Sequence, residues 1–159
     1  MSYDDAEDVE GIKRILALYC QYLDDGNLEG TMSLFTEDGI VHAGGRTYKG
    51  EEEVRQFMVN FFNGTPEGNL WLHMLSDAVI KINSDGVTGE GRINMSGFRS
   101  LPVGRWSFDY VNRHHDRYRK VDGQWLFAEK GMESRSTFRR QTSEVTSPFS
   151  ISFDGVRET

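Results

Sequence analysis

The sequence predicts an α+β fold in which three N-terminal helices pack on a strongly curved antiparallel sheet and enclose a pocket. Two observations lead to this class. Apolar residues first recur at steps of three and four residues, as on one face of a helix, and later alternate through long segments rich in β-branched and aromatic residues. Helices followed by hairpin-connected strands are typical of α+β domains, in which the helices cover one side of the sheet.

The three helices are expected within the first 62 residues. The first should end near Gly26, and its buried stripe consists of Val9, Ile12, Leu16, Tyr19 and Leu23. A second, short helix is expected from about Leu28 to Phe35. The third begins at "GEEEVRQFMVNFF", where three glutamates in the first turn favour the positive end of the helix dipole.

Four strands are expected after the loop "NGTPEGN", and they form two hairpins. The segments "LWLHMLSDAVIKIN" and "VTGEGRINMSGFRS" are joined by a turn at Ser84-Asp85-Gly86, and "RWSFDYVNRHHDRYRKV" and "QWLFAEKGMESRS" by Asp122-Gly123. In the third strand the aromatic parity should face inward, which takes His114 inside and leaves His115 in solvent. The inward set is Trp106, Phe108, Tyr110, Asn112, His114, Asp116 and Tyr118.

Length and charge indicate one cytoplasmic domain. We expect the domain to span residues 1–139 of the 159, followed by a polar tail at 140–159 that is a lid or disordered. A net charge of −7 and a pI near 5.1 argue against nucleic acid or an anionic membrane as partner. No apolar run approaches the roughly 20 residues of a membrane span, and the N-terminus is too acidic for a signal peptide. The single cysteine, Cys20, fits a reducing compartment.

Four side chains are candidates for chemistry, and each also has a structural interpretation. Asp24 lies at the margin of the first helix's apolar stripe and can face a cavity, whereas Asp25 points away; a solvated helix-end carboxylate is the alternative. Parity does not orient His73, because both alternating sets of its strand are largely apolar, so a core histidine fits equally. Tyr19 fits a hydrogen-bond donor or a boundary tyrosine, and His114 also fits a structural role.

No cofactor or metal site is expected. The cluster His114-His115-Asp116 looks like a metal site, but adjacent strand residues point to opposite faces. The glycines of "GEGRINMSG" lack the strand–turn–helix context of a phosphate loop. Nothing near Cys20 indicates an activated thiolate.

Four segments carry a resemblance to a known family: "YCQYLDDGNLEGTMSLFTEDG", "YKGEEEVRQFM", "LHMLSDAVIKI" and "HHDRYRKVDGQWLFAEKG". Over roughly residues 8–135 the chain resembles the SnoaL-like branch of the NTF2-like superfamily, a cone-shaped fold. Within this branch it is most similar to scytalone-dehydratase-like lyases, including bile-acid dehydratases and hexachlorocyclohexane dehydrochlorinase. One scaffold hosts many functions in this superfamily, so the resemblance bears on the fold more than on the activity.

The resemblance implies a catalytic dyad. Asp24 and His73 match the helix aspartate and the strand histidine of these lyases, and Tyr19 matches a helix tyrosine of bile-acid dehydratases and the oxyanion-hole tyrosine of ketosteroid isomerases. The role of His114 does not carry over. An isomerase fits less well, because its carboxylate base should follow the second helix, where this chain has His42-Ala43.

The expected function is a cofactor-independent, dehydratase-like elimination on a small hydrophobic alcohol or ketone. Asp24 would fix the tautomer of His73 and leave its other ring nitrogen free as the base. Tyr19 would stabilise developing negative charge, and His114, or a water that it holds, would protonate the departing hydroxide. The alternatives are a non-catalytic small subunit or ligand-binding module, and an isomerase or cyclase of the same fold. Apolar residues on both parities of "LWLHMLSDAVI" predict a homo-oligomer, a dimer or trimer.

Overall fold

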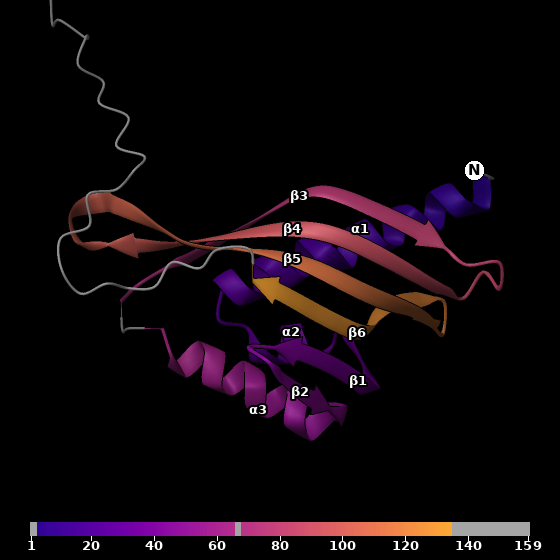
Figure 1. Ribbon diagram of the computed structural model, residues 1–159, viewed down its shortest axis with the longest axis horizontal. Coiled ribbons are helices and arrows are strands. Elements are labelled where there is room, and N and C mark those ends of the chain that lie inside the picture. The colour runs from indigo at the N-terminus through magenta and orange to yellow at the C-terminus, as the bar shows by residue number, and fades with distance from the viewer. Residues whose placement is uncertain (1–2, 66–67, 135–159) are drawn as a thin grey trace, which may run out of the picture.

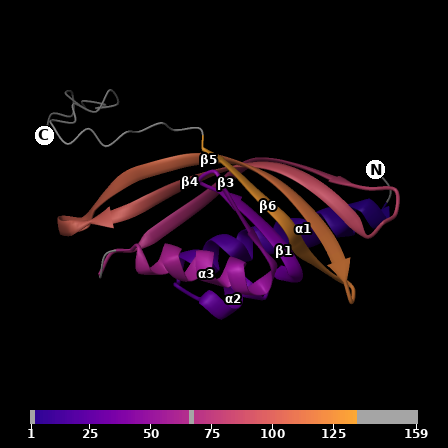
Figure 2. The ribbon, with the colours of Figure 1, turned by 60° about the horizontal axis from the view of Figure 1, so that its bottom comes forward.

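The computed structural model describes residues 3–65 and 68–134, which form three helices and one six-stranded sheet (Figure 1). The helices are α1 (Tyr3–Asp24), α2 (Leu28–Met32) and α3 (Gly50–Asn63). The strands are β1 (Phe35–Ala43), β2 (Arg46–Lys49), β3 (Trp71–Ile82), β4 (Thr88–Leu101), β5 (Arg105–Val121) and β6 (Gln124–Ser134). Figure 2 shows the helices together beneath the curved sheet, which confirms the predicted α+β architecture.

The sheet is mixed, so the prediction of a purely antiparallel sheet is wrong at one pairing. The strand order is β2-β1-β6-β5-β4-β3, and β1 runs parallel to β6 while every other neighbouring pair is antiparallel. A parallel pair needs a long crossover connection. Here the crossover is all of the chain from β2 to β5, and it brings the last strand back beside the first.

Strands β1 and β2 were not predicted at all. The short helix expected to reach Phe35 ends at Met32, and Phe35 already belongs to β1. Acidic residues and a glycine interrupt the alternation of "FTEDGIVHA", and the ladder between β1 and β6 is irregular over the same stretch. The pairing is therefore set by long-range contacts, which a local pattern does not report.

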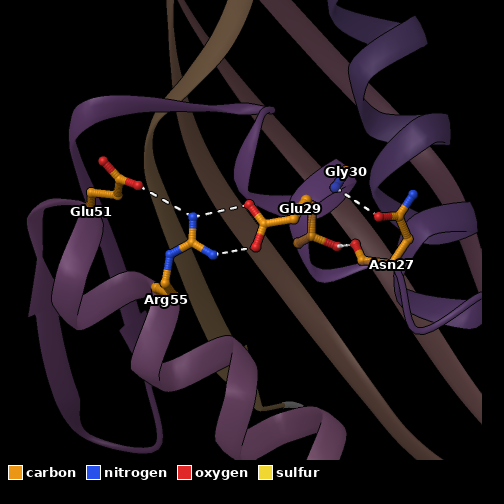
Figure 3. A network of polar contacts seen from close by, with 6 residues as sticks. Asn27, Glu29, Gly30, Glu51 and Arg55 are labelled. Carbon is orange, nitrogen blue, oxygen red and sulfur yellow. Dashed lines mark hydrogen bonds and ion pairs between the residues drawn. The ribbon is translucent and has the colours of Figure 1, made fainter.

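The short helix α2 is held by polar contacts at its start and along its side (Figure 3). The side chain of Asn27 accepts a hydrogen bond from the backbone N–H of Gly30 at 2.8 Å, which caps the helix. From α3, the guanidinium of Arg55 binds both carboxylate oxygens of Glu29, at 2.5 and 3.2 Å, and also reaches Glu51 at 3.3 Å. These pairs are largely exposed, so they orient the two helices more than they stabilise the fold.

A β-bulge reverses the parity of β5 near its beginning. Tyr110 pairs with Gly97, whereas Phe108 pairs with the next residue of β4, so Asp109 is the extra residue. As a consequence Trp106 and Phe108 are on the outer face, 49% and 45% exposed. The prediction that these two aromatic residues face inward is therefore wrong.

Beyond the bulge the predicted alternation of β5 holds. His114, Asp116 and Tyr118 are buried on the inner face, and His115 and Arg117 are exposed on the outer face. The inner face meets α1, whose stripe of Ile12, Leu16, Tyr19 and Leu23 is buried in the same core.

The core also contains an ion pair. The ammonium of Lys130 on β6 lies 2.8 Å from a carboxylate oxygen of Asp116 on β5, and neither side chain is more than 1% exposed. The same ammonium lies 4.4 Å from the ring centroid of Tyr19 and 4.3 Å from that of Phe127. Each charge depends on the other, since no water reaches either one.

We expect Lys130→Met to lower the free energy of unfolding by about 3–5 kcal/mol, because it leaves the Asp116 carboxylate buried without its cation. The double variant Lys130→Met/Asp116→Leu should recover most of that loss. Urea denaturation measures both effects. Lys81→Met, which breaks an exposed pair with Glu90, is the matched control and should change stability by less than about 1 kcal/mol. Equal losses in the two lysine variants would contradict this account.

Candidate active site

Asp24 and His73 lie side by side in the interior, although 49 residues separate them. Asp24 is the last residue of α1, and His73 is on β3. Nδ1 of His73 is 2.5 Å from Oδ1 of Asp24, and the backbone N–H of His73 donates to both carboxylate oxygens at 3.1 Å. The imidazole has no exposed surface, whereas the side chain of Asp24 is 19% exposed. Asp25, as expected, faces solvent.

These contacts fix the direction of the hydrogen bonds. An ionised carboxylate can only accept, and that of Asp24 faces one backbone N–H and one ring nitrogen. Nδ1 of His73 therefore carries the hydrogen, and in the neutral imidazole Nε2 presents its lone pair.

Nε2 of His73 is already occupied, which differs from the expectation that it is free. The hydroxyl oxygen of Tyr110 lies 2.5 Å from it, and because the nitrogen accepts, the phenol must donate. The alternation of β5 predicted that Tyr110 faces inward but indicated no role for it. The structure thus contains a chain of hydrogen bonds from Tyr110 through His73 to Asp24.

A glycine makes this contact possible. His73, Gly97 and Tyr110 are direct cross-strand neighbours on β3, β4 and β5. Two strand spacings of about 4.8 Å separate the outer two backbones, so Tyr110 must cross β4 to reach the histidine. A Cβ atom at Gly97 would lie 2.5 Å from the Tyr110 ring. A glycine inside a strand often marks such a close approach, and this was the signal in the sequence that could have identified the site.

Aromatic rings close the imidazole in. Trp71 stacks on it at 5.7 Å with an interplanar angle of 24°, and the ring centroid of Phe61 lies 6.0 Å away. The guanidinium of Arg99 lies over the ring of Trp71, 6.0 Å from its centroid. The same guanidinium pairs with the carboxylate of Asp109 at 2.9 Å. These aromatic contacts account for the burial of the imidazole.

Burial keeps the nearby phenol and thiol protonated. Burial raises the pKa of Tyr110 above its usual value, and the nearby carboxylates of Asp24 and Asp109 act in the same direction. Burial also raises the pKa of the Cys20 thiol to about 12, so this residue does not serve as a thiolate nucleophile at neutral pH.

Tyr19 lies in the hydrophobic core. It is 2% exposed, packs edge-on against Phe35 and Phe127, and receives the Lys130 ammonium over its ring. Burial raises the pKa of its phenol well above the usual value. Among the described residues no hydrogen bond joins Tyr19 to Asp24 or His73, so the structure places it near the dyad without linking it to the dyad.

His114 is fully buried, and neither of its ring nitrogens has a hydrogen-bond partner among the described residues. Burial lowers its pKa well below the usual value, and the nearby positive charge of Lys130 adds to this effect. The imidazole is therefore neutral in the folded protein. It lies on the inner face of β5, four residues beyond Tyr110.

Other polar groups lie away from the dyad. His42, which occupies the position of an isomerase base, lies 2.9 Å from the Thr47 hydroxyl and 2.8 Å from a Glu129 oxygen, with 41% of its side chain exposed. A hollow of about 430 Å³ on the outer face is lined by charged residues of both signs, including Arg92 and Arg117. It does not contact Asp24 or His73, so we do not assign the chemistry to it.

Between residues 3 and 134, omitting 66–67, no group of three or more His, Cys, Asp or Glu side chains is arranged to hold a metal ion. None of the helices in this part of the chain is long and apolar enough to cross a membrane. The expected tail at 140–159 lies outside the described residues.

Comparisons with known proteins agree with this architecture. The family model of the SnoaL-like domain matches residues 4–130, and no curated protein matches the chain. A structure from Novosphingobium aromaticivorans described as a "Putative Scytalone Dehydratase" is similar with a TM-score of 0.73 and 21% identity, covering 86% of this chain and 89% of that one. A protein of unknown function with a cystatin-like fold from Nostoc punctiforme gives 0.71 and 21%, covering 83% and 94%. A "putative aromatic ring hydroxylase" from N. aromaticivorans gives 0.70 and 20%, covering 82% and 91%. At these identities the structures show a shared fold.

The buried, neutral state of His114 predicts a loss of stability in acid. The unfolded chain binds a proton at this residue below a pH of about 6.5, whereas the folded chain does not, so the free energy of unfolding falls as the pH drops through that value. One proton accounts for a slope of up to about 1.4 kcal/mol per pH unit. Denaturant titrations of the wild type and His114→Leu between pH 7 and 5 should therefore diverge by that slope. Parallel curves would show that His114 is not held neutral.

Proposed function

We propose that this protein is a cofactor-independent lyase with Asp24 and His73 as its general-base dyad. The chain belongs to the SnoaL-like domain family, whose model matches residues 4–130. The substrate would be a small hydrophobic alcohol or ketone, and the reaction a dehydratase-like elimination. The observation that carries the proposal is the 2.5 Å contact between Nδ1 of His73 and the Asp24 carboxylate inside the fold.

The dyad has the properties that proton abstraction from carbon needs. The carboxylate holds one tautomer of His73 and stabilises the imidazolium that forms when the histidine receives a proton. The backbone N–H contacts fix Asp24 against β3, so the pair is preorganised without a bound ligand. A general base of this kind contributes about 10²–10⁴-fold to a rate.

Tyr19 and His114 complete the proposed machinery. Tyr19 would donate a hydrogen bond to the negative charge that develops on the substrate, since its phenol is protonated. His114, or a water that it holds, would assist the departing hydroxide. Both roles require the substrate to reach side chains that are buried in the core.

Kemp elimination of 5-nitrobenzisoxazole tests the base without knowledge of the natural substrate. A base removes the ring C–H proton of this flat probe, the N–O bond breaks, and a coloured phenolate is released. We expect His73→Ala and Asp24→Asn to lower the rate of this reaction by about 10²–10⁴-fold, with little change in melting temperature.

Asp25→Asn is the matched control, because it removes the neighbouring carboxylate that faces solvent, and it should keep the wild-type rate. A His73→Ala variant as fast as the wild type would exclude the dyad as the base.

We also propose that the protein is a homodimer formed through an outer apolar patch. This patch covers β3, β4 and β5 around Phe98 and includes Leu70, the residue directly before β3. Its exposed side chains are all uncharged: Leu70 (62% exposed), Leu72 (44%), Met74 (54%), Trp106 (49%) and Phe108 (45%). Two copies related by a twofold axis through Phe98 would place apolar surface against apolar surface. An uncharged patch on a chain of net charge −7 matches itself better than it matches a charged partner.

Sedimentation velocity at micromolar concentration should give a mass of twice 18.2 kDa for the wild type. Leu72→Lys places a cation inside the apolar interface, next to Phe98, and should give a monomer with an unchanged far-UV circular dichroism spectrum. Val79→Lys, at an exposed position on the same strand outside the patch, should remain dimeric. A monomeric wild type, or a dimeric Leu72→Lys variant, would contradict this interface.

A further inference from the structure

We propose that Tyr110 is the catalytic residue that contacts the substrate and removes its proton, while it passes its own phenolic proton to His73 in the same step. This inference rests on the proposed function and changes one part of it. The base is then a relay of Tyr110, His73 and Asp24, in which the histidine is the proton acceptor but not the point of contact.

A substrate has no direct access to the imidazole of His73. The side chain of His73 has no exposed surface, and both of its ring nitrogens are engaged, one by Asp24 and one by Tyr110. A substrate cannot touch this imidazole unless Tyr110 moves away. Tyr110 itself is only partly buried, whereas His73 is buried.

The direction of the hydrogen bonds makes Tyr110 an acceptor toward the substrate. Asp24 accepts from Nδ1, so Nε2 accepts from the phenol, and every hydrogen in the chain points toward the carboxylate. The hydroxyl oxygen of Tyr110 therefore turns its lone pairs away from His73. A group that offers lone pairs to the substrate acts as a base rather than as an acid.

The contact between Tyr110 and His73 requires a glycine that lowers the stability of the sheet. Tyr110 reaches His73 only because Gly97 has no side chain between them, and glycine inside a strand weakens the sheet. Burial raises the pKa of Tyr110, so the residue remains a phenol at rest and has a proton to give. A phenol that gives its proton to His73 as it receives one never becomes a free phenolate.

The step balances. The substrate C–H bond breaks and a new O–H bond forms at Tyr110, while the original Tyr110 O–H bond breaks and an N–H bond forms at Nε2 of His73. The electron pair of the C–H bond forms the new double bond and expels hydroxide. The imidazolium then returns its proton through Tyr110, the hydroxide becomes water, and no oxidant or cofactor takes part.

Tyr110→Phe tests the relay with 5-nitrobenzisoxazole as the probe, because it keeps the ring and removes only the hydroxyl. We expect a rate loss of about 10²–10⁴-fold, as large as that of His73→Ala. The double variant Tyr110→Phe/His73→Ala should be no slower than either single variant, since both residues act in one step.

Gly97→Ala, which displaces the ring of Tyr110, should also slow the reaction while both catalytic side chains remain. Tyr48→Phe, in a tyrosine that packs on Phe57 instead, is the matched control and should keep the wild-type rate.

The outcomes separate this inference from the proposed function. If Tyr110→Phe matches or exceeds the wild-type rate while His73→Ala is slow, His73 is the direct base and Tyr110 only covers it; the relay is then wrong and the dyad stands. If the wild type is no faster than His73→Ala, both proposals fail.

Discussion

The carboxylate of Asp24 is the contact on which the rest of the site depends. It joins the end of α1 to β3 through three hydrogen bonds from a single residue, two from the backbone N–H of His73 and one from its ring. Because this carboxylate only accepts, it determines which nitrogen of His73 carries a hydrogen and, in turn, which way the Tyr110 hydroxyl points. One carboxylate thus sets the direction of the hydrogen bonds of two further side chains, on β3 and β5.

The sheet has room for this arrangement because two positions of β4 are glycines, which have no side chain. Gly97 leaves a gap that the Tyr110 ring crosses, and at Gly91 an added Cβ atom would lie 2.9 Å from the hydroxyl of Tyr118. Both glycines are on β4, and both crossing side chains come from β5. The absence of a side chain at these two positions therefore leaves room for the rings of Tyr110 and Tyr118 on the inner face.

Much of this structure could be predicted from local pattern, and the rest depended on pairing. The stripe of α1, the margin position of Asp24 and the burial of His114 follow from residue spacing, which is a property of one element. The exposure of Trp106 depends on the bulge at Asp109. The direction in which His73 points depends on which face of β3 meets α1. The parallel pairing of β1 with β6 depends on a crossover that contains most of the chain. The link between Tyr110 and His73 required two neighbouring strands in register, and only Gly97 recorded it in the sequence.

The most direct test of the account is the tautomer of His73 in the wild-type protein, measured by long-range ¹H–¹⁵N correlation with ¹⁵N-labelled histidine at neutral pH. Our account predicts a neutral ring with its hydrogen on Nδ1 and an Nε2 resonance shifted by an accepted hydrogen bond, and it predicts that Tyr110→Phe removes that shift. A hydrogen on Nε2, or a ring that does not respond to the loss of the Tyr110 hydroxyl, would contradict the chain of hydrogen bonds from which the chemistry is derived.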